Sequence, residues 1–144
     1  MQRENLIMDN NPIINIKNRL KDSLLKVCDN VSTTYILPKA ELDLADAYPF
    51  IAIILNKIKM VNSTPKAWLI VDLYCVVHDE TDYLAERRDN FISTVYFAIP
   101  NYTGQTVDID IANTFTNYNF VAGFNEPFGA FKISLQIPFE YLKK

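Results

Sequence analysis

The segment from Ala67 to Val77 constrains the fold more than any other part of the sequence. Its odd-numbered positions are all apolar: Ala67, Leu69, Val71, Leu73, Cys75 and Val77. A period of two is the side-chain period of a β-strand, whose successive residues point to opposite faces. A strand of this length with one wholly apolar face has to lie against a core. The sequence therefore predicts a sheet with a long strand inside it.

A second apolar segment lies just before this strand and completes a predicted hairpin. Phe50 to Leu55 is too apolar for a strand with a water-facing side, so we expect a central strand that continues towards Val61. Asn62 to Pro65 separates the two strands and is rich in residues that form turns. Two such strands joined by a short turn pair in antiparallel fashion.

The even-numbered face of the second hairpin strand is the first candidate interaction surface. It carries Trp68, Ile70, Asp72, Tyr74, Val76 and His78. Because this face is half apolar, we expect it to need a cover from another element or another chain. Asp72 is the one acid on it and requires a partner, either a tyrosine hydroxyl or a basic group of another subunit. The interface residues predicted on this face are Trp68, Ile70, Asp72 and Tyr74.

A helix is predicted before the hairpin. Asn11 can cap it, and Pro12 suits its first position, where a missing N–H costs nothing. Apolar residues then recur at steps of three and four, which indicates an amphipathic helix from about 12 to 29. These residues are Ile13, Ile16, Leu20, Leu24, Val27 and Val31. Arg19 and Lys26 lie on its polar side, which is either solvated or in contact with a neighbouring subunit.

A second helix is predicted after the hairpin, from about 81 to 98. The acids and hydroxyl between Asp79 and Asp82 suit its beginning, and Pro100 marks its end. Leu84, Phe91, Ile92, Val95 and Ile99 form its apolar side. The run from Glu86 to Asp89 forms its polar side, either as an ion-pair cluster, within the helix or between subunits, or as a clamp for a phosphate. Glu86 and Asp89 are candidate interface residues.

The remaining strands complete an α+β fold. Short strands are expected over Thr33 to Leu37 and Val107 to Ile111, with a last strand from Phe131 to Phe139. A further strand or an ordered loop is expected over Phe115 to Phe124. We predict a flexible arm over 1–11 and a single domain over 12–144, with a mainly antiparallel sheet, a long hairpin and two helices on one face.

Composition narrows the classes of partner. The formal net charge of -3 gives no electrostatic reason to bind nucleic acid, because phosphate binding needs a clustered basic surface, so no sequence-specific nucleic-acid binding is expected. Cys28 and Cys75 lie on apolar faces, which favours buried free thiols and a reducing compartment. No apolar run reaches the length of about 20 residues that crosses a bilayer, and the first residues resemble no secretory signal. We expect no membrane association.

The sequence offers little for catalysis. His78 is the single histidine and lies near a strand end, and Cys75 lies on the apolar face, where a thiolate is disfavoured. Asp108 and Asp110 share one face of a strand and either bind a cation, act in acid–base chemistry or are merely solvated. The three glycines are isolated, so no phosphate loop is present. We predict a protein without catalytic residues, metal or cofactor.

The order of these elements resembles the tail-terminator and head–tail completion proteins of long-tailed bacteriophages. In that family an N-terminal helix is followed by a proline-aromatic-aliphatic segment, a long hairpin, a second helix and closing strands. The corresponding features are the helix from Pro12, the run Tyr48-Pro-Phe-Ile-Ala-Ile53, the hairpin through Trp68 to Tyr74, the helix Leu84 to Ile99, and Phe131 to Phe139. The segment Asn113 to Pro127 departs from the pattern.

The resemblance implies a structural protein of the virion neck or tail, assembled in the host cytoplasm. It implies a homo-oligomeric ring that joins the tail tube to the head connector. Six subunits are the first expectation for this ring, and twelve are the next. The family contributes no catalytic residue. The competing hypothesis is a small ligand-binding or enzymatic α+β domain with its pocket between the sheet and the helices.

Overall fold

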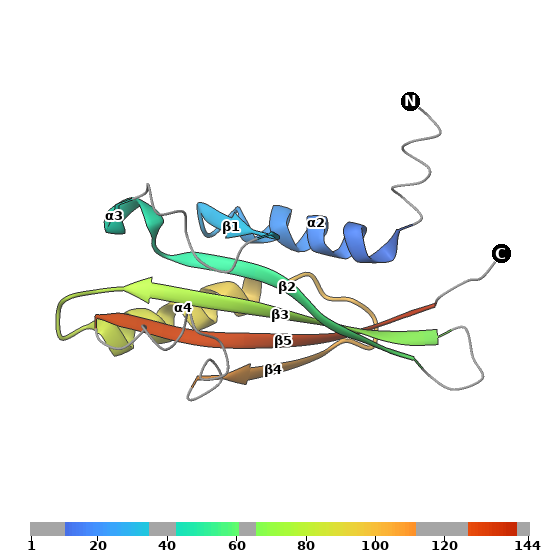
Figure 1. Ribbon diagram of the computed structural model, residues 1–144. Coiled ribbons are helices and arrows are strands. Elements are labelled where there is room, and N and C mark those ends of the chain that lie inside the picture. Colours follow the sequence, from blue (N-terminus) through green and yellow to red (C-terminus); the bar gives the residue numbers. More distant parts are fainter. Residues whose placement is uncertain (1–10, 35–42, 61–65, 112–126, 141–144) are drawn as a thin grey trace, which may run out of the picture.

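The computed structural model describes residues 11–34, 43–60, 66–111 and 127–140. Within these ranges the elements follow the order helix, strand, short helix, long hairpin, helix and two strands (Figure 1). Three predicted features lie outside the described residues. They are the expected arm apart from Asn11, the hairpin turn at Asn62 to Pro65, and the stretch Phe115 to Phe124.

A five-stranded sheet forms the body of the molecule, with the strand order β1-β2-β3-β5-β4. Its members are β1 (Asn30–Ser32), β2 (Phe50–Met60), β3 (Lys66–His78), β4 (Thr106–Asp110) and β5 (Phe128–Glu140). Every neighbouring pair is antiparallel except β1 and β2, which run parallel. The two longest strands, β3 and β5, pair along their whole lengths near the middle of the sheet.

The predicted long hairpin is confirmed as β2 and β3. Phe50 lies opposite Val76, and Met60 lies opposite Ala67. The register shifts between Leu55 and Lys57, so Asn56 is an extra residue in β2, as in a β-bulge. The proline before the hairpin, Pro49, follows a cis peptide bond.

The first helix, α2 (Pro12–Leu24), begins as predicted and ends earlier than predicted. The Asn11 side chain accepts a hydrogen bond from the Ile14 N–H, and Pro12 occupies the first turn. The chain then turns at 25–27 instead of continuing to residue 29. Val31 consequently leaves the helical pattern and joins β1 at 30–32. Of the strand expected over 33–37, Thr33 and Thr34 form a bend, and 35–37 lie outside the described residues.

The second long helix, α4 (Leu84–Ala98), begins three residues later than predicted. Asp79 does not cap the helix itself, because its carboxylate accepts from the Thr81 N–H and hydroxyl within the preceding turn. Tyr83, at the cap position, makes no side-chain capping bond. A short helix that we did not predict, α3 (Leu44–Ala47), has Asp43 as its cap, with its carboxylate accepting from the Asp46 N–H.

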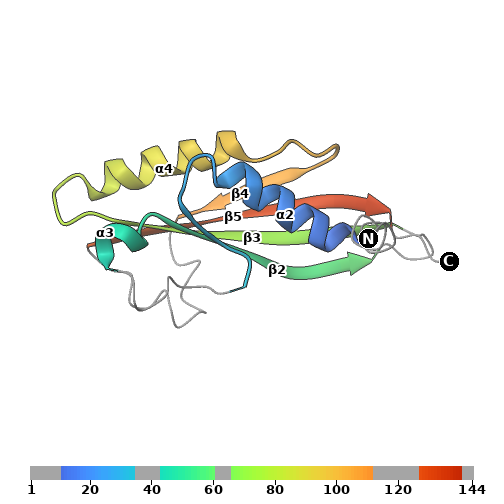
Figure 2. The same ribbon diagram turned by 90° about the horizontal axis from the view of Figure 1, so that it is seen from above.

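Both long helices pack on one side of the sheet, which we call the helical face (Figure 2). The odd-numbered residues of β3 form the centre of this core, together with buried residues of both helices and of β5. These helix and β5 residues are Ile16, Leu20, Leu24, Phe91, Val95, Phe131, Ile133, Leu135 and Ile137. The predicted fold class, a mainly antiparallel α+β domain with a long hairpin and two packed helices, is confirmed.

Candidate protein interface

The face of the sheet opposite the helices, which we call the opposite face, is divided into a buried and an exposed part. At the β1 end, Phe50, Ala52 and Tyr74 form a second small core, with Tyr48, Ile54 and Ala130 packed against it. Tyr74 and Asp72 are each 1% exposed. For this part of the face, where we expected a cover from another element or another chain, both side chains are already buried within the chain. A neighbouring subunit cannot contact them directly in this fold.

Asp72 has its partners inside the chain. Its Oδ2 accepts hydrogen bonds from Asn56 Nδ2 at 2.7 Å and from the Tyr74 hydroxyl at 3.4 Å, and its Oδ1 accepts from Ser134 Oγ at 2.7 Å. Of the two predicted partners, the tyrosine hydroxyl is therefore present. The three donors come from β2, β3 and β5, so this buried acid joins the three central strands. Its role is to order the sheet at the bulge.

The other end of the same face is open. Trp68 is half-buried, and its cross-strand neighbours are Lys59 and Pro138. Ile70 is almost fully buried, with Lys57 and Gln136 as its neighbours. Both lysines are exposed. Of the four residues predicted on this face, Trp68 is thus the most accessible to a partner.

The outer part of β2, from Asn56 to Met60, is exposed on both faces. Ile58 and Met60 point to the helical face, because they lie opposite Leu69 and Ala67, yet they are 40% and 50% exposed. β1 pairs with β2 only at residues 50–52, so no described strand pairs with the outer edge of β2 beyond that point. This segment combines an unpaired strand edge with alternating lysines and large apolar side chains.

The far edge of the sheet has a complementary composition. β4 is the last strand of the order, and no other described strand pairs with its outer edge. Asp108 and Asp110 share one face of the strand, as predicted from their spacing; this is the opposite face, and both are exposed. Val107 and Ile109 lie on the helical face, and Ile109 is 36% exposed. Exposed strand edges are ready templates for pairing with another chain.

The predicted charges on the helices occupy different environments. The Arg19 guanidinium lies 4.9 Å from the centre of the Tyr102 ring, a cation–π contact within the chain. Lys26 is exposed in the turn after α2. Glu86 and Asp89 are exposed on α4, where Asp89 pairs with Arg88 at 3.1 Å. That pair is within the helix, as the ion-pair interpretation of this cluster predicts.

Exposed aromatic side chains on α4 form a surface that the sequence analysis missed. Phe97 is 81% exposed and packs edge-on against Tyr96, which is also exposed, and Tyr83 is exposed before the helix. The signal was available, because Tyr96 and Phe97 do not belong to the apolar side of the helix defined by Phe91 and Val95. Exposed aromatic pairs are typical of protein interfaces.

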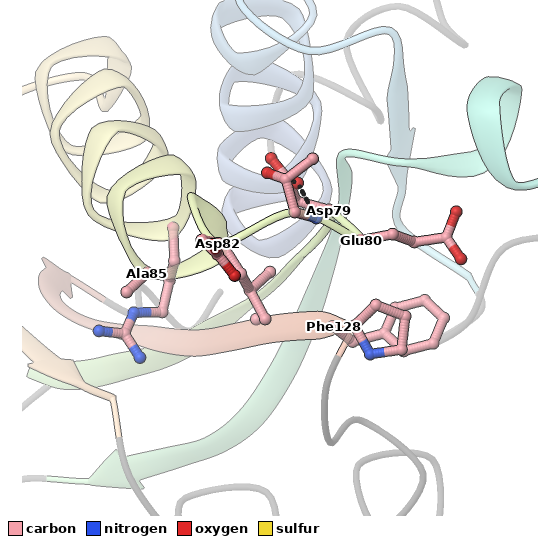
Figure 3. Close-up of a pocket in the computed structure, with 10 residues that line it drawn as sticks. Asp79, Glu80, Asp82, Ala85 and Phe128 are labelled. Carbon is pink, nitrogen blue, oxygen red and sulfur yellow. Dashed lines mark hydrogen bonds between the residues drawn. The ribbon is translucent and has the colours of Figure 1, made fainter.

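A surface hollow of about 490 Å³ lies where α4 and β5 begin (Figure 3). Asp79, Glu80, Asp82 and Ala85 line it from the helix side and Phe128 from β5. A second hollow, of about 610 Å³, lies beside it and is lined by Arg87, Asn90 and Thr94 among others. Among the described residues that line the two hollows there is neither a histidine nor a cysteine.

Asp79 lines both hollows. Hydrogen bonds from Thr81, and then the Arg87 guanidinium at 2.9 Å, lower the pKa of the Asp79 carboxyl below its usual range. Arg87 is thereby engaged with an acid of its own chain. This arrangement joins the turn to the helix. Arg88, which pairs with Asp89, lines the first hollow.

The two thiols are buried and free, as predicted. Burial raises the pKa of Cys28 to about 11 and raises the pKa of Cys75 well above its usual range. His78 is half-buried at the end of β3, with its ring 5.0 Å from that of Phe128 and 6.3 Å from that of Tyr48. The two cysteines and this histidine do not form an arrangement suited to nucleophilic catalysis.

No protein-family model and no curated protein matches this chain. Among the helices in the described ranges, none is long and apolar enough to cross a membrane. Within the same ranges, no group of three or more His, Cys, Asp or Glu side chains could hold a metal ion. Function is therefore inferred from the fold and from its exposed surfaces.

Proposed function

We propose that this chain is a structural subunit of a phage head–tail junction, where copies of it form a ring between the tail tube and the head connector. The order of its elements supports the proposal. A capped helix, a proline-aromatic strand start, a long hairpin, a second helix and closing strands follow one another as in the tail-terminator and head–tail completion proteins it resembles. The proposal includes assembly in the host cytoplasm and a place in the virion neck or tail.

One observation carries the proposal, namely the exposed outer part of the hairpin. β2 continues from Asn56 to Met60 beyond the buried part of the strand, and it exposes Ile58 and Met60 there. Apolar side chains held on a rigid, exposed strand are typical of a surface that another protein covers.

The helical charges and Trp68 are proposed to complete this contact. Trp68 supplies a large half-buried ring beside Lys59. Arg19, Lys26, Glu86 and Asp89 are on the surface and can select the angle between subunits, although each exposed ion pair contributes little energy. Asp72 and Tyr74 act from within, because they fix the strands that present this surface.

The competing function, a ligand-binding or enzymatic domain, is less well supported. It requires a pocket between the sheet and the helices, but the central side chains of β3 on that side are fully buried in a packed core. Leu69, Val71 and Leu73 are examples, each with no exposed surface. The two surface hollows lie between α4 and the ends of β3 and β5, at one end of the sheet, and not along its centre.

Electron microscopy of the purified chain tests the proposal. We expect a ring with a central opening, and we expect the same density at the junction of head and tail in virions that contain the chain. A chain that stayed monomeric at high concentration, and that also failed to join any tail or connector complex, would contradict the proposal.

A further inference from the structure

We propose that the subunits join edge to edge, with the outer edge of β4 in one copy pairing with the outer part of β2 in the next copy. The sheet would then continue from subunit to subunit. This inference rests on the proposed ring and adds to it the two segments that meet. It follows from the strand directions, the charges and the apolar side chains of the two edges.

The strand directions suit such a contact. β2 and β5 run in one direction, and β3 and β4 run in the other, because each successive pair from β2 to β4 in the sheet order is antiparallel. Copies related by rotation about an axis roughly along the strands keep these directions. β4 of one copy therefore meets β2 of the next in antiparallel fashion, and the helical faces of both copies lie on the same side.

Charge complementarity identifies the occupant of each edge as a second copy of the chain. On the opposite face, β4 carries Asp108 and Asp110, and the outer part of β2 carries Lys57 and Lys59. All four side chains are exposed, and none has an ion pair among the described residues. One antiparallel register places Asp108 opposite Lys59 and Asp110 opposite Lys57. Opposite charges directly across two strands favour pairing.

The same register also matches the apolar side chains. It places Ile109 opposite Ile58 on the helical face, and Val107 opposite Met60. Ile109, Ile58 and Met60 are all among the exposed large hydrophobic residues of the chain. Pairing the edges would cover them and would satisfy the outer N–H and C=O groups of both strands. The register requires a stagger along the strands, which closed sheets ordinarily have.

Charge reversal on each edge provides the test. One variant carries Lys57→Glu and Lys59→Glu, and the other carries Asp108→Lys and Asp110→Lys. Each variant alone places like charges at every junction, so we expect each to lose the ring. An equimolar mixture restores opposite charges at every junction, so we expect an alternating ring to form. A chain with all four substitutions should also assemble by itself.

Light scattering gives the mass of each sample, and circular dichroism with thermal unfolding confirms that every variant is folded. The matched control is Asp29→Lys with Glu80→Lys, which reverses two exposed acids outside β4 and outside the outer part of β2 and should leave the ring intact. If the wild type forms a ring that neither edge variant disturbs, the edge pairing is wrong and the ring stands. If the wild type forms no ring at all, both proposals fail.

A pair of cysteines tests the register. With Lys59→Cys and Asp108→Cys in one chain, mild oxidation should link neighbouring copies in high yield. Lys66→Cys with Asp108→Cys is the control and should link poorly, because residue 66 lies in β3, away from the edge. The native Cys28 and Cys75 are buried and should contribute little. Equal linkage in both variants would overturn the proposed register.

Discussion

The two parts of β2 differ in burial. From Phe50 to Ile53 the strand is buried on both faces, between the helical core and the smaller core around Tyr74. From Asn56 to Met60 it is exposed on both faces, although it continues to pair with β3. One strand thus has a part that stabilises the fold and a part that is available to a partner.

The bulge marks the boundary between these two parts. Asn56 is the extra residue, and its side chain donates to the buried Asp72 carboxylate. The shift in register turns Lys57 and Lys59 to the opposite face and turns Ile58 and Met60 to the helical face. Without the bulge these side chains would exchange faces, because a slip by one residue reverses every side chain of a strand. The bulge therefore determines which face of the exposed part carries charge.

The largest expected effect separates Tyr74 from Trp68, which lie on the same face of β3. Tyr74→Ala should lower the free energy of unfolding by about 3–5 kcal/mol, because it removes a buried aromatic ring. Trp68→Ala should lower it by less and should weaken ring assembly, because Trp68 is half-buried beside the exposed lysines. Urea denaturation and light scattering measure the two effects. Equal losses of stability in both variants would remove the distinction between the two ends of this face.

A matched pair in β2 sharpens the same comparison. Ile53→Ala should lower the free energy of unfolding by about 2–5 kcal/mol, since the side chain is fully buried. Ile58→Ala removes the same atoms from an exposed position and should change stability by about 0.5 kcal/mol or less. Its effect should appear in assembly instead, and denaturation with light scattering again separates the two. A large loss of stability from Ile58→Ala would place this residue in the core of the fold.

The boundary itself is tested at Asp72. Asp72→Ala leaves the donors Asn56 and Ser134 without their acceptor and should lower the free energy of unfolding by about 1–3 kcal/mol. Asp29→Ala is the control, since this acid is exposed, lies outside the proposed contact and should change stability by about 0.5 kcal/mol or less. Chemical denaturation measures the free energy of unfolding of both variants. If Asp72→Ala left it unchanged, the hydrogen bonds of Asp72 would not hold the strands together.

The smallest expected effect concerns Asp79, which lies outside β2 and serves as a reference for the variants in the sheet. Its pKa is lowered in the folded state, so the carboxylate adds stability above its unfolded pKa of about 3.9. That contribution is lost as the pH falls through the lower folded pKa. The difference in unfolding free energy between the wild type and Asp79→Asn should therefore be present at neutral pH and shrink in acid. A difference that grew in acid would contradict the assigned direction.

Much of the fold could be predicted from periodicity. The alternation from Ala67 to Val77 identified the long strand, and the cap at Asn11 located the start of α2. The end of α2 was misplaced because Val27 and Val31 continue the helical spacing by coincidence. Val27 is exposed in the turn, whereas Val31 is buried through pairing of β1 with β2, a long-range contact that local spacing does not reveal.

The surface was harder to predict than the fold. The sequence indicated that Asp72 needs a partner, but Ser134 is distant in the chain and meets it only through the pairing of β3 with β5. The burial of Tyr74 likewise depends on residues brought together by the sheet, including those around Ala52. Asp108 and Asp110 were correctly placed on one exposed face, but their relation to the lysines of β2 required the strand order.

The mass of the wild-type chain in solution tests the central claim most directly. Light scattering during gel filtration, repeated over rising protein concentration, should give a discrete species with about six times the chain mass of 16.6 kDa, or about twelve times that mass. A closed ring predicts that this mass stays constant once it is reached. A single species of 16.6 kDa at every concentration, or a mass that rises without limit, would contradict the closed ring.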